Sequence, residues 1–262
     1  MLFGGAALAR RIEAAEAANA VGCTAAQAGA AVLEVGGGRA LFAGKDSPLT
    51  HAVGMGLNGP VQEGEIDGME DFFHSRKAKV TMDLCPLADA GFLQSLARRG
   101  YRATEFNNVM VKVMAGVEIV MTPRVRPALA LEADRWAHTV GCGFFEQPEL
   151  TTEEMDVGRA IFQTPEAICY LAAAESGELA AGAALSIRNG LAMLFADSTI
   201  PRFRRGGFQR ELITARLNEA VAQGCDLATS SVFPGSGSQR NYERMGFQVI
   251  YTRFTLTEAA NS

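Results

Sequence analysis

Pro201-Arg-Phe-Arg-Arg-Gly-Gly-Phe-Gln209 decides the fold, because it joins two segments of different periodicity. Leu191–Ala196 before it is apolar and β-prone, which predicts a buried strand, whereas Phe208–Ala222 after it has apolar residues at helical spacing. Together with Arg210, this turn carries two glycines and four arginines. Unpaired N–H groups and the positive end of the helix dipole favour anions at such a helix start. We therefore predict a phosphate or pyrophosphate site; the alternative is an ordinary exposed basic turn.

The composition narrows the class of protein. The chain has 262 residues, 48% of them hydrophobic, which is enough for one large or two modest domains. Its net charge of −5 argues against a general nucleic-acid or membrane-surface role, so the arginine cluster is suited to a small anion. Five scattered cysteines without a C-x-x-C pair, and three histidines without ligand spacing, predict neither a disulfide framework nor a metal site.

The N-terminus predicts an amphipathic helix instead of a signal peptide. The basic pair Arg10-Arg11 follows the apolar run instead of preceding it, and Glu13 and Glu16 come next. No apolar run approaches the length of a membrane span. These features predict a soluble, cytoplasmic protein.

The periodicity predicts an alternation of strands and helices in two halves. Strands are expected at 30–35, 39–43, 49–57, 79–84, 102–114, 167–174, 178–187, 191–196, 226–233 and 248–256. Helices are expected at 65–77, 87–99, 132–145, 151–163, 208–222 and 238–245. The Pro-bearing stretch Met121–Pro127 is the expected linker. The two halves also repeat one another, since Leu96–Tyr101 and Tyr242–Phe247 each end a helix and enter a strand.

The order strand, Pro201-x-x-Arg204-x-x-Gly207, helix, strand, helix, Tyr242-x-x-x-Gly246-Phe247, strand resembles the core of the GNAT acetyltransferase superfamily. The resemblance covers roughly residues 151–256. It departs from the family's phosphate-loop pattern at Gln209, where a glycine or alanine is usual. The resemblance implies an α/β (α+β) fold of two GNAT-like halves, each a mixed, mostly antiparallel twisted sheet flanked by helices. Residues 1–122 would be a degenerate domain, and 123–262 the catalytic domain.

The resemblance also implies that acetyl-CoA is a cosubstrate. Its pyrophosphate would lie on the turn, and its pantetheine arm would pair with main chain of the fourth strand, where the fourth and fifth strands of the family splay apart. The binding residues implied are Ser198, Thr199, Ile200, Arg204, Arg205, Gly206, Gly207, Phe208 and Gln209, together with Ser238 and Asn241 on the last helix. Gly235 and Ser238 depart from the family pattern around Asn241.

Two residues are the candidates for catalysis. Tyr242 matches the family's frequent general acid, and a phenol of pKa about 10 suits donation to a thiolate; the alternative is a tyrosine that packs on the sheet. Asp197, beside the expected thioester, is a candidate base. Glu153 and Glu154 are weaker candidates, because acids at a helix start more often serve the helix dipole, and water could carry the proton.

The first half has lost the anion-binding features. Its corresponding turn reads Asn58-Gly-Pro-Val-Gln-Glu-Gly-Glu65, in which Glu63 and Glu65 would repel a pyrophosphate. Leu96 stands where the second half has Tyr242. We therefore expect acetyl-CoA to bind only the second half.

The function predicted from the sequence is an N-acetyltransferase in which a primary amine of a small-molecule or peptide acceptor attacks acetyl-CoA directly. Two alternatives stay open: a non-catalytic acyl-CoA-binding or sensing protein, and an enzyme that binds a nucleotide or phosphosugar. The chain has no Gly-x-x-x-x-Gly-Lys-Ser/Thr stretch, which argues against a P-loop NTPase.

Overall fold

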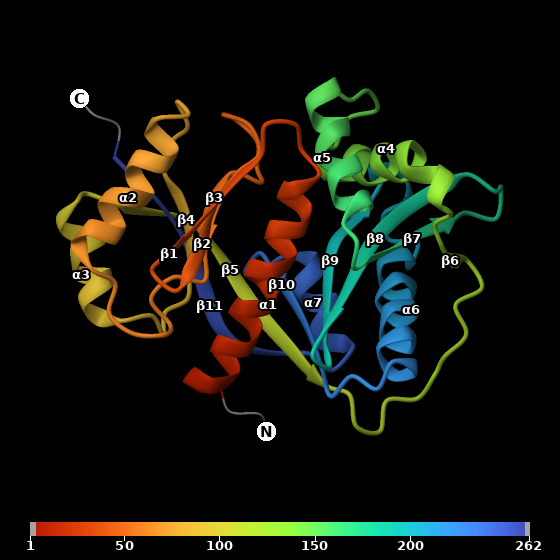
Figure 1. Cartoon of the computed structure of the whole chain (residues 1–262). Coiled ribbons are helices and arrows are strands. Elements are labelled where there is room, and N and C mark those ends of the chain that lie inside the picture. Colours follow the sequence, from red (N-terminus) through yellow and green to blue (C-terminus); the bar gives the residue numbers. More distant parts are fainter. Residues whose placement is uncertain (1–3, 260–262) are drawn as a thin grey trace. The chain divides into compact units, whose positions relative to one another are not determined.

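A computed structural model describes residues 4–259, which separate into two compact units (Figure 1). Unit 1 contains the chain up to Val109, the short piece Val232–Pro234 and the chain from Val249 onward. Unit 2 contains Met110–Ser231 and Gly235–Gln248. Each unit therefore draws on both halves of the sequence.

Unit 1 is a sheet with helices packed on it. Its elements are α1 (Ala6–Ala25), β1 (Ala31–Val35), β2 (Gly38–Phe42), β3 (His51–Val53), α2 (Glu63–His74), β4 (Thr81–Leu84), α3 (Ala90–Arg98), the first part of β5 (Arg102–Val113) and most of β11 (Gln248–Thr257). The strand order is β1-β2-β3-β4-β11-β5. Only the β3–β4 pair is parallel among the pairs β1–β2, β2–β3, β3–β4 and β4–β11.

Unit 2 has the same plan. Its elements are the end of β5, β6 (Val125–Pro127), the 3₁₀ turn η1 (Ala130–Glu132), α4 (Ala133–Phe144), α5 (Thr152–Gln163), β7 (Ala167–Ala173), β8 (Leu179–Arg188), β9 (Leu191–Thr199), η2 (Pro201–Phe203), α6 (Phe208–Ala222), β10 (Leu227–Val232) and α7 (Gly237–Arg244). The strand order is β5-β10-β9-β8-β7-β6. The β9–β10 pair is parallel, and the pairs β9–β8, β8–β7 and β7–β6 are antiparallel.

The two units confirm the predicted fold class of mixed, mostly antiparallel sheets flanked by helices. In each half of the sequence, antiparallel strands (β1–β3 and β6–β9) lead to a helix, a parallel strand, a second helix and a further strand. The parallel pair forms in both because the connection between its strands is a helix, which is long enough for a crossover. This shared order agrees with the repeat seen in the sequence.

The division of the chain into the two units does not follow the predicted domain boundary between residues 122 and 123. Met110–Val113 of β5 belong to unit 2, and Val249–Thr257 of β11 belong to unit 1, so each unit contains a strand segment from the other half of the sequence. The expected linker also contains a strand, because β6 pairs with β7 from Val125↔Ala172 to Pro127↔Tyr170. Its proline ends the run at the outer strand of the sheet, where a missing N–H is tolerated.

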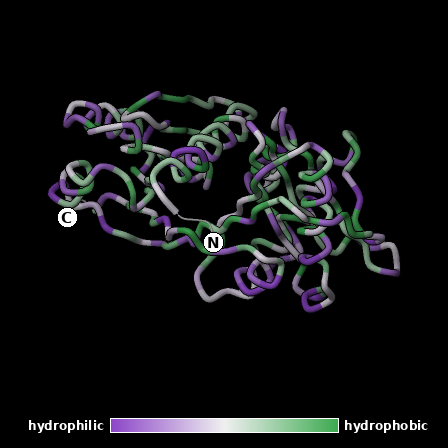
Figure 2. Tube along the Cα trace, turned by 90° about the horizontal axis from the view of Figure 1, so that it is seen from below, coloured by the Kyte–Doolittle hydropathy of each residue, from purple (hydrophilic) through white to green (hydrophobic). Residues whose placement is uncertain are grey.

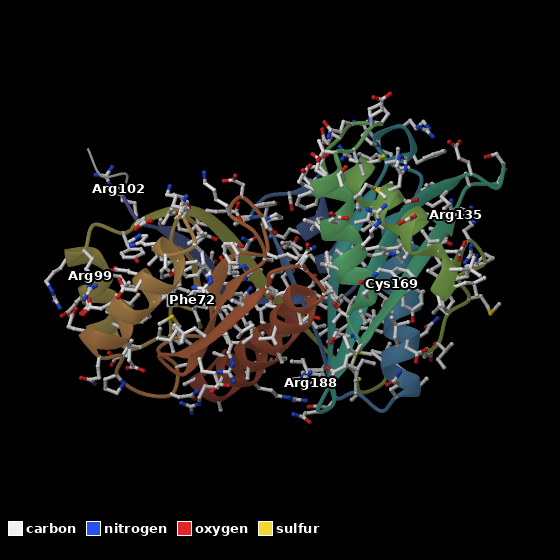
Figure 3. The ribbon with its side chains drawn as sticks, turned by 45° about the horizontal axis from the view of Figure 1, so that its top comes forward. Phe72, Arg99, Arg102, Arg135, Cys169 and Arg188 are labelled. Carbon is white, nitrogen blue, oxygen red and sulfur yellow. The ribbon has the colours of Figure 1, made fainter. Side chains whose placement is uncertain are left out.

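Each unit has its own apolar core. Phe72 belongs to the core of unit 1, and Cys169 to a cluster around the fully buried Trp136 in unit 2 (Figure 3). Hydrophilic stretches, purple in Figure 2, lie on loops and helix turns at the periphery. One strand is shorter than expected: β3 ends at Val53 because Gly54 and Gly56 take positive φ angles of 75° and 74°, which a β-strand cannot contain.

Candidate functional site

The turn before α6 is built so that its backbone can be approached closely. Gly207 is the N-cap residue, with φ at +81°, a left-handed conformation that glycine adopts without steric cost. A Cβ on Gly206 would lie 2.8 Å from Phe208 Cε2 and 3.0 Å from the Phe203 carbonyl oxygen, so any larger residue would force these neighbours to shift. Arg205 takes a φ of +65°, which is costly for a side chain of its size. A glycine at the N-cap supplies no side-chain cap, and an anion can take that role.

The arginines of the turn do not all point at the helix start. Arg204 donates from Nη1 to Glu146 Oε1 at 2.7 Å and from Nη2 to the Gly143 carbonyl at 3.1 Å, so it ties the turn to the end of α4. Arg202 pairs with Glu178. Arg204 therefore fixes the shape of the turn, and both Arg202 and Arg204 are paired with carboxylates of the chain.

Arg124, which directly precedes β6, contacts this turn, and the sequence did not predict that contact. Its guanidinium lies over the Phe208 ring at 4.3 Å, donates from Nη2 to the Gly206 carbonyl at 3.0 Å and pairs with Glu211 at 2.8 Å from Nε. The residue lies in the expected linker Met121–Pro127, and nothing in the sequence around it indicates a contact with α6. Arg124 therefore packs against the helix start, where Glu211 balances its charge.

The strands β9 and β10 separate next to this turn. They pair in register only from Leu191↔Leu227 to Met193↔Thr229, although β9 continues to Thr199. The rest of β9 pairs with β8 alone, up to Ala181↔Thr199. One edge of β9 therefore runs beyond its partner towards the turn, and an extended ligand can add there by main-chain hydrogen bonds.

The residues at the end of β9 make different contacts. Ser198 Oγ is buried, has no hydrogen-bond partner, and packs so close to α4 that a Cβ on Gly143 would lie 2.2 Å from it. The Thr199 carbonyl accepts a hydrogen bond from Arg204 at 3.4 Å, and the Ile200 amide donates to the Ala180 carbonyl. Any contact of Ser198 with a ligand would therefore be through its main chain.

Gln209, the departure from the family pattern, connects α6 to α7. Its Nε2 donates to Ser238 Oγ and its Oε1 accepts from Asn241 Nδ2, both at 2.7 Å. The structure thus brings together three of the predicted ligand-binding residues. It also shows that Ser238 and Asn241 are held by a protein side chain that the small residue usual in the family could not supply.

Tyr242 and Asp197 are also brought together, with a third residue that was not predicted to act. The Tyr242 hydroxyl donates to Asp197 Oδ2, and Arg216 donates to Asp197 Oδ1. Tyr242 and Arg216 are fully buried. Burial, and next the negative charge of Asp197, raise the pKa of Tyr242 well above its usual value. These contacts disfavour the predicted roles: the phenol is a weak acid whose proton is already donated, and the carboxylate already accepts from two donors.

Glu154 has a structural role at the start of α5. Its carboxylate accepts the Thr151 amide at 2.8 Å while Thr151 Oγ1 accepts the Glu154 amide at 3.2 Å, which is a capping box at the start of α5.

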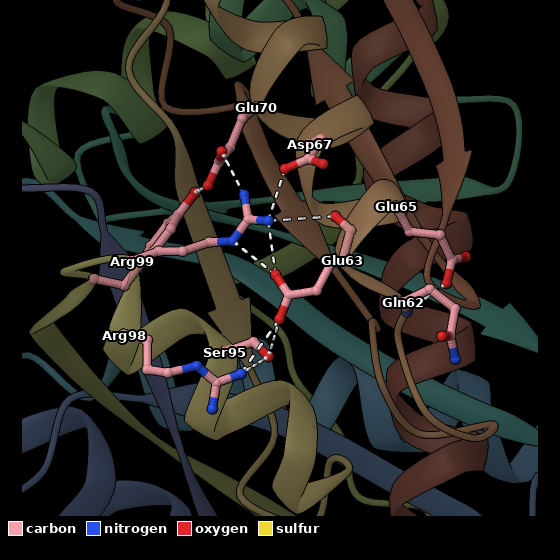
Figure 4. A network of polar contacts seen from close by, with 9 residues as sticks. Gln62, Glu63, Glu65, Asp67, Glu70, Ser95, Arg98 and Arg99 are labelled. Atoms are coloured by element: carbon pink, nitrogen blue, oxygen red, sulfur yellow. Dashed lines mark hydrogen bonds and ion pairs between the residues drawn. The ribbon is translucent and has the colours of Figure 1, made fainter.

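The corresponding helix start in unit 1 is occupied by a carboxylate of the chain itself. Glu65 accepts from the Gln62 amide at 2.9 Å and from the Gly36 amide at 3.0 Å. An internal anion thus takes the place that an external anion could occupy at α6. Next to it, hydrogen bonds from Ser95 and then Arg99 lower the pKa of Glu63 to about 2, so this carboxylate stays charged (Figure 4).

Arg99 is the centre of this acidic group in unit 1. Its guanidinium donates to Glu63 at 2.7 Å, to Asp67 at 2.7 Å and to Glu70 at 2.8 Å (Figure 4). The arginine is therefore neutralised by its own neighbours. Both observations support the prediction that unit 1 does not bind an anionic ligand at α2.

Residues 4–259 contain no cluster of three or more His, Cys, Asp and Glu side chains arranged to hold a metal ion. Across the same residues, no helix has the length and apolarity needed to cross a membrane.

Comparison with known proteins agrees with this geometry. Residues 133–247 match the model of the acetyltransferase (GNAT) family. None of the curated proteins matches the sequence significantly.

Solved structures show the same fold. A GCN5-related N-acetyltransferase from Kribbella flavida superposes with a TM-score of 0.69 at 17% identity, with 96% of each chain covered. A tandem GNAT protein from the clavulanic acid biosynthesis pathway gives 0.61 at 15% identity, covering 99% of this chain and 96% of its own. A putative GNAT-family acetyltransferase from Novosphingobium aromaticivorans gives 0.53 at 18% identity, covering 77% and 83%. The stretch 133–247, which carries the turn, the separated strands and Tyr242, is therefore a domain of the GNAT acetyltransferase family.

Proposed function

We propose that unit 2 binds acetyl-CoA and transfers its acetyl group to a primary amine of a small-molecule or peptide acceptor. The observation that carries the proposal is the pairing of two features: a helix start with an exposed glycine turn, and the edge of β9 that runs towards it. Together they suit a ligand with a pyrophosphate at one end and an extended, amide-containing arm at the other.

The binding mode follows from the order of these features. The pyrophosphate lies on the amides from Arg205 to Gln209, and Arg124, which is paired with Glu211, places its guanidinium next to the turn. The pantetheine arm runs along the main chain of Asp197–Ile200, which places the thioester near the point where β9 and β10 separate. Acetyl-CoA acts as a cosubstrate, and no metal takes part in this scheme.

The chemistry is a direct transfer. The amine nitrogen attacks the thioester carbonyl carbon, the C–S bond breaks, and the electron pair leaves with sulfur while the nitrogen loses a proton. A backbone N–H at the edge of β9 stabilises the oxyanion that forms. A thiol of pKa about 8.5 leaves readily as a thiolate, so the step does not depend on a strong acid, and water can carry the protons.

Isothermal titration calorimetry tests the binding half of this proposal. We expect one acetyl-CoA site per chain, because α6 presents an uncapped helix start whereas Glu65 occupies the equivalent place at α2. ADP and inorganic pyrophosphate serve as control ligands and are expected to bind more weakly, since neither can pair with β9. Two equivalent sites, or an ADP affinity equal to that of acetyl-CoA, would contradict the proposal.

A further inference from the structure

Arg216 is an unusual residue for the buried face of α6, where its neighbours are apolar. Its side chain is completely buried, and each of the three guanidinium nitrogens donates at least one hydrogen bond. Nε donates to the Leu212 carbonyl at 3.0 Å, Nη1 to the carbonyls of Ala184 at 3.1 Å and Phe195 at 3.4 Å, and Nη2 to Asp197 Oδ1. A buried guanidinium is costly unless its charge and its donors are all satisfied, and here Asp197 supplies the balancing charge.

The two carbonyls held by Arg216 belong to Ala184 of β8 and Phe195 of β9, the register pair that directly precedes a bulge in β9. The register runs Gly182↔Ser198 and Ala184↔Phe195, so Ala183 faces two residues, Ala196 and Asp197. Ala196 takes a φ of +52°, a left-handed conformation that costs energy in a residue with a Cβ. A bulge breaks the ladder and leaves main-chain groups in need of partners, and Arg216 supplies donors to them.

Tyr242 completes the group from α7. Its hydroxyl donates to Asp197 Oδ2, and its ring packs edge-on against Phe247 at 4.9 Å. The Asp197 carboxylate on the bulge therefore accepts hydrogen bonds from Arg216 of α6 and from Tyr242 of α7. Loss of the Tyr242 proton would place a phenolate against Asp197, and two negative charges at hydrogen-bond distance repel strongly.

We propose that Asp197, Arg216 and Tyr242 form a clamp that fixes the bulge in β9, so that all three are positioning residues for acetyl transfer. The clamp sets the direction of the main-chain groups of Asp197–Ile200, along which the thioester lies. Tyr242 acts through Asp197 and does not donate a proton to the leaving sulfur. This inference rests on the proposed function, because the group being positioned is the acetyl thioester.

Asp197→Asn separates the clamp from an acid role, because the two predict opposite changes in rate. If Tyr242 were the acid, loss of the carboxylate would free its hydroxyl and remove a charge that raises its pKa, so kcat would hold or rise. The clamp predicts that kcat falls by about 10²-fold, the scale of a misplaced reacting group. It also predicts that the Kd for acetyl-CoA rises because pairing with β9 weakens, while the Kd for ADP, which does not reach β9, stays unchanged. Tyr242→Phe is expected to behave alike, and the double variant to be no slower than the slower single variant.

Hydrogen exchange provides a measurement that needs neither turnover nor a stable Asp197→Asn protein. The clamp predicts that Tyr242→Phe speeds amide exchange at Phe195–Ser198. Tyr251→Phe, which removes the hydroxyl of another buried tyrosine that donates to a carboxylate, Glu13 of unit 1, leaves exchange there and kcat unchanged. A kcat in Asp197→Asn at or above that of the wild type would overturn the proposal. So would exchange in Tyr242→Phe equal to that of the wild type. If the wild-type protein neither binds nor uses acetyl-CoA, the proposed function fails, and the exchange experiment still decides whether the clamp holds the bulge.

Discussion

Gly207→Glu is expected to weaken acetyl-CoA binding by about 100-fold or more. A Cβ at this position faces the guanidinium of Arg124 at 3.4 Å, so the new carboxylate would lie at the start of α6. Like charges brought together cost several kcal/mol, and each 1.4 kcal/mol is a factor of ten in affinity. The chain already contains this arrangement in unit 1, where the Glu65 carboxylate occupies the start of α2. Calorimetry with acetyl-CoA measures the change.

Two further variants isolate the charge from the strain of a side chain at positive φ. Gly207→Ala introduces the strain without the charge, and we expect it to lower stability by about 1–2 kcal/mol while binding persists. Gly177→Glu places the same charge at a glycine of φ +84° with open space around it, in the turn between β7 and β8. This control should bind acetyl-CoA normally. Wild-type affinity in Gly207→Glu would show that the ligand does not use this turn.

The fragment 123–262 is expected to be largely unfolded, although it contains the whole predicted catalytic domain. It lacks Met110–Met114, where three side chains are almost completely buried: Met110, Val111 and Met114. It also loses the hydrogen bonds of Thr229 Oγ1 to the Met110 carbonyl and of the Met114 amide to the Asp226 carbonyl, both at 3.0 Å. Removal of one large buried apolar side chain costs about 2–5 kcal/mol, against a total stability of about 5–15 kcal/mol.

The fragment 110–248 is the matched control, because it contains every residue of unit 2 and ends where β11 passes into unit 1. It should unfold cooperatively in a thermal melt followed by circular dichroism, at a higher midpoint than 123–262. A fragment 123–262 that melts at the temperature of the parent chain would show that the strand segment from the first half is dispensable.

The parts of this fold that the sequence predicts are those with local causes. The start of α6 was predictable because Gly206-Gly207 follows an apolar strand and precedes a helical repeat, and the element begins at Phe208 as expected. The exchange of strand segments was not predictable, because β11 has the same alternating pattern whether it pairs with β4 or with a strand of unit 2. Pairing between distant segments leaves no local signal.

The candidate site shows the same limit. The turn was identifiable from spacing, and Asp197 and Tyr242 from the resemblance to the GNAT family. The contact between these two side chains depends on the bulge in β9, and a bulge is set by tertiary packing. Arg216 carried a signal, since an arginine on the apolar face of a helix needs a buried partner. Arg124 carried none, because its role depends on where β6 lies in the sheet.

The central claim is that unit 2 transfers an acetyl group to an amine, and mass spectrometry of the acceptor tests it most directly. The protein is incubated with deuterium-labelled acetyl-CoA and a panel of primary amines that includes polyamines, amino acid amides, amino sugars and peptide N-termini. We predict that at least one acceptor gains the labelled acetyl group in an amount equal to the CoA released. The claim is contradicted if acetyl-CoA binds but no acceptor carries the label and CoA release is the same with and without amines, which would identify an acyl-CoA-binding protein without transfer activity.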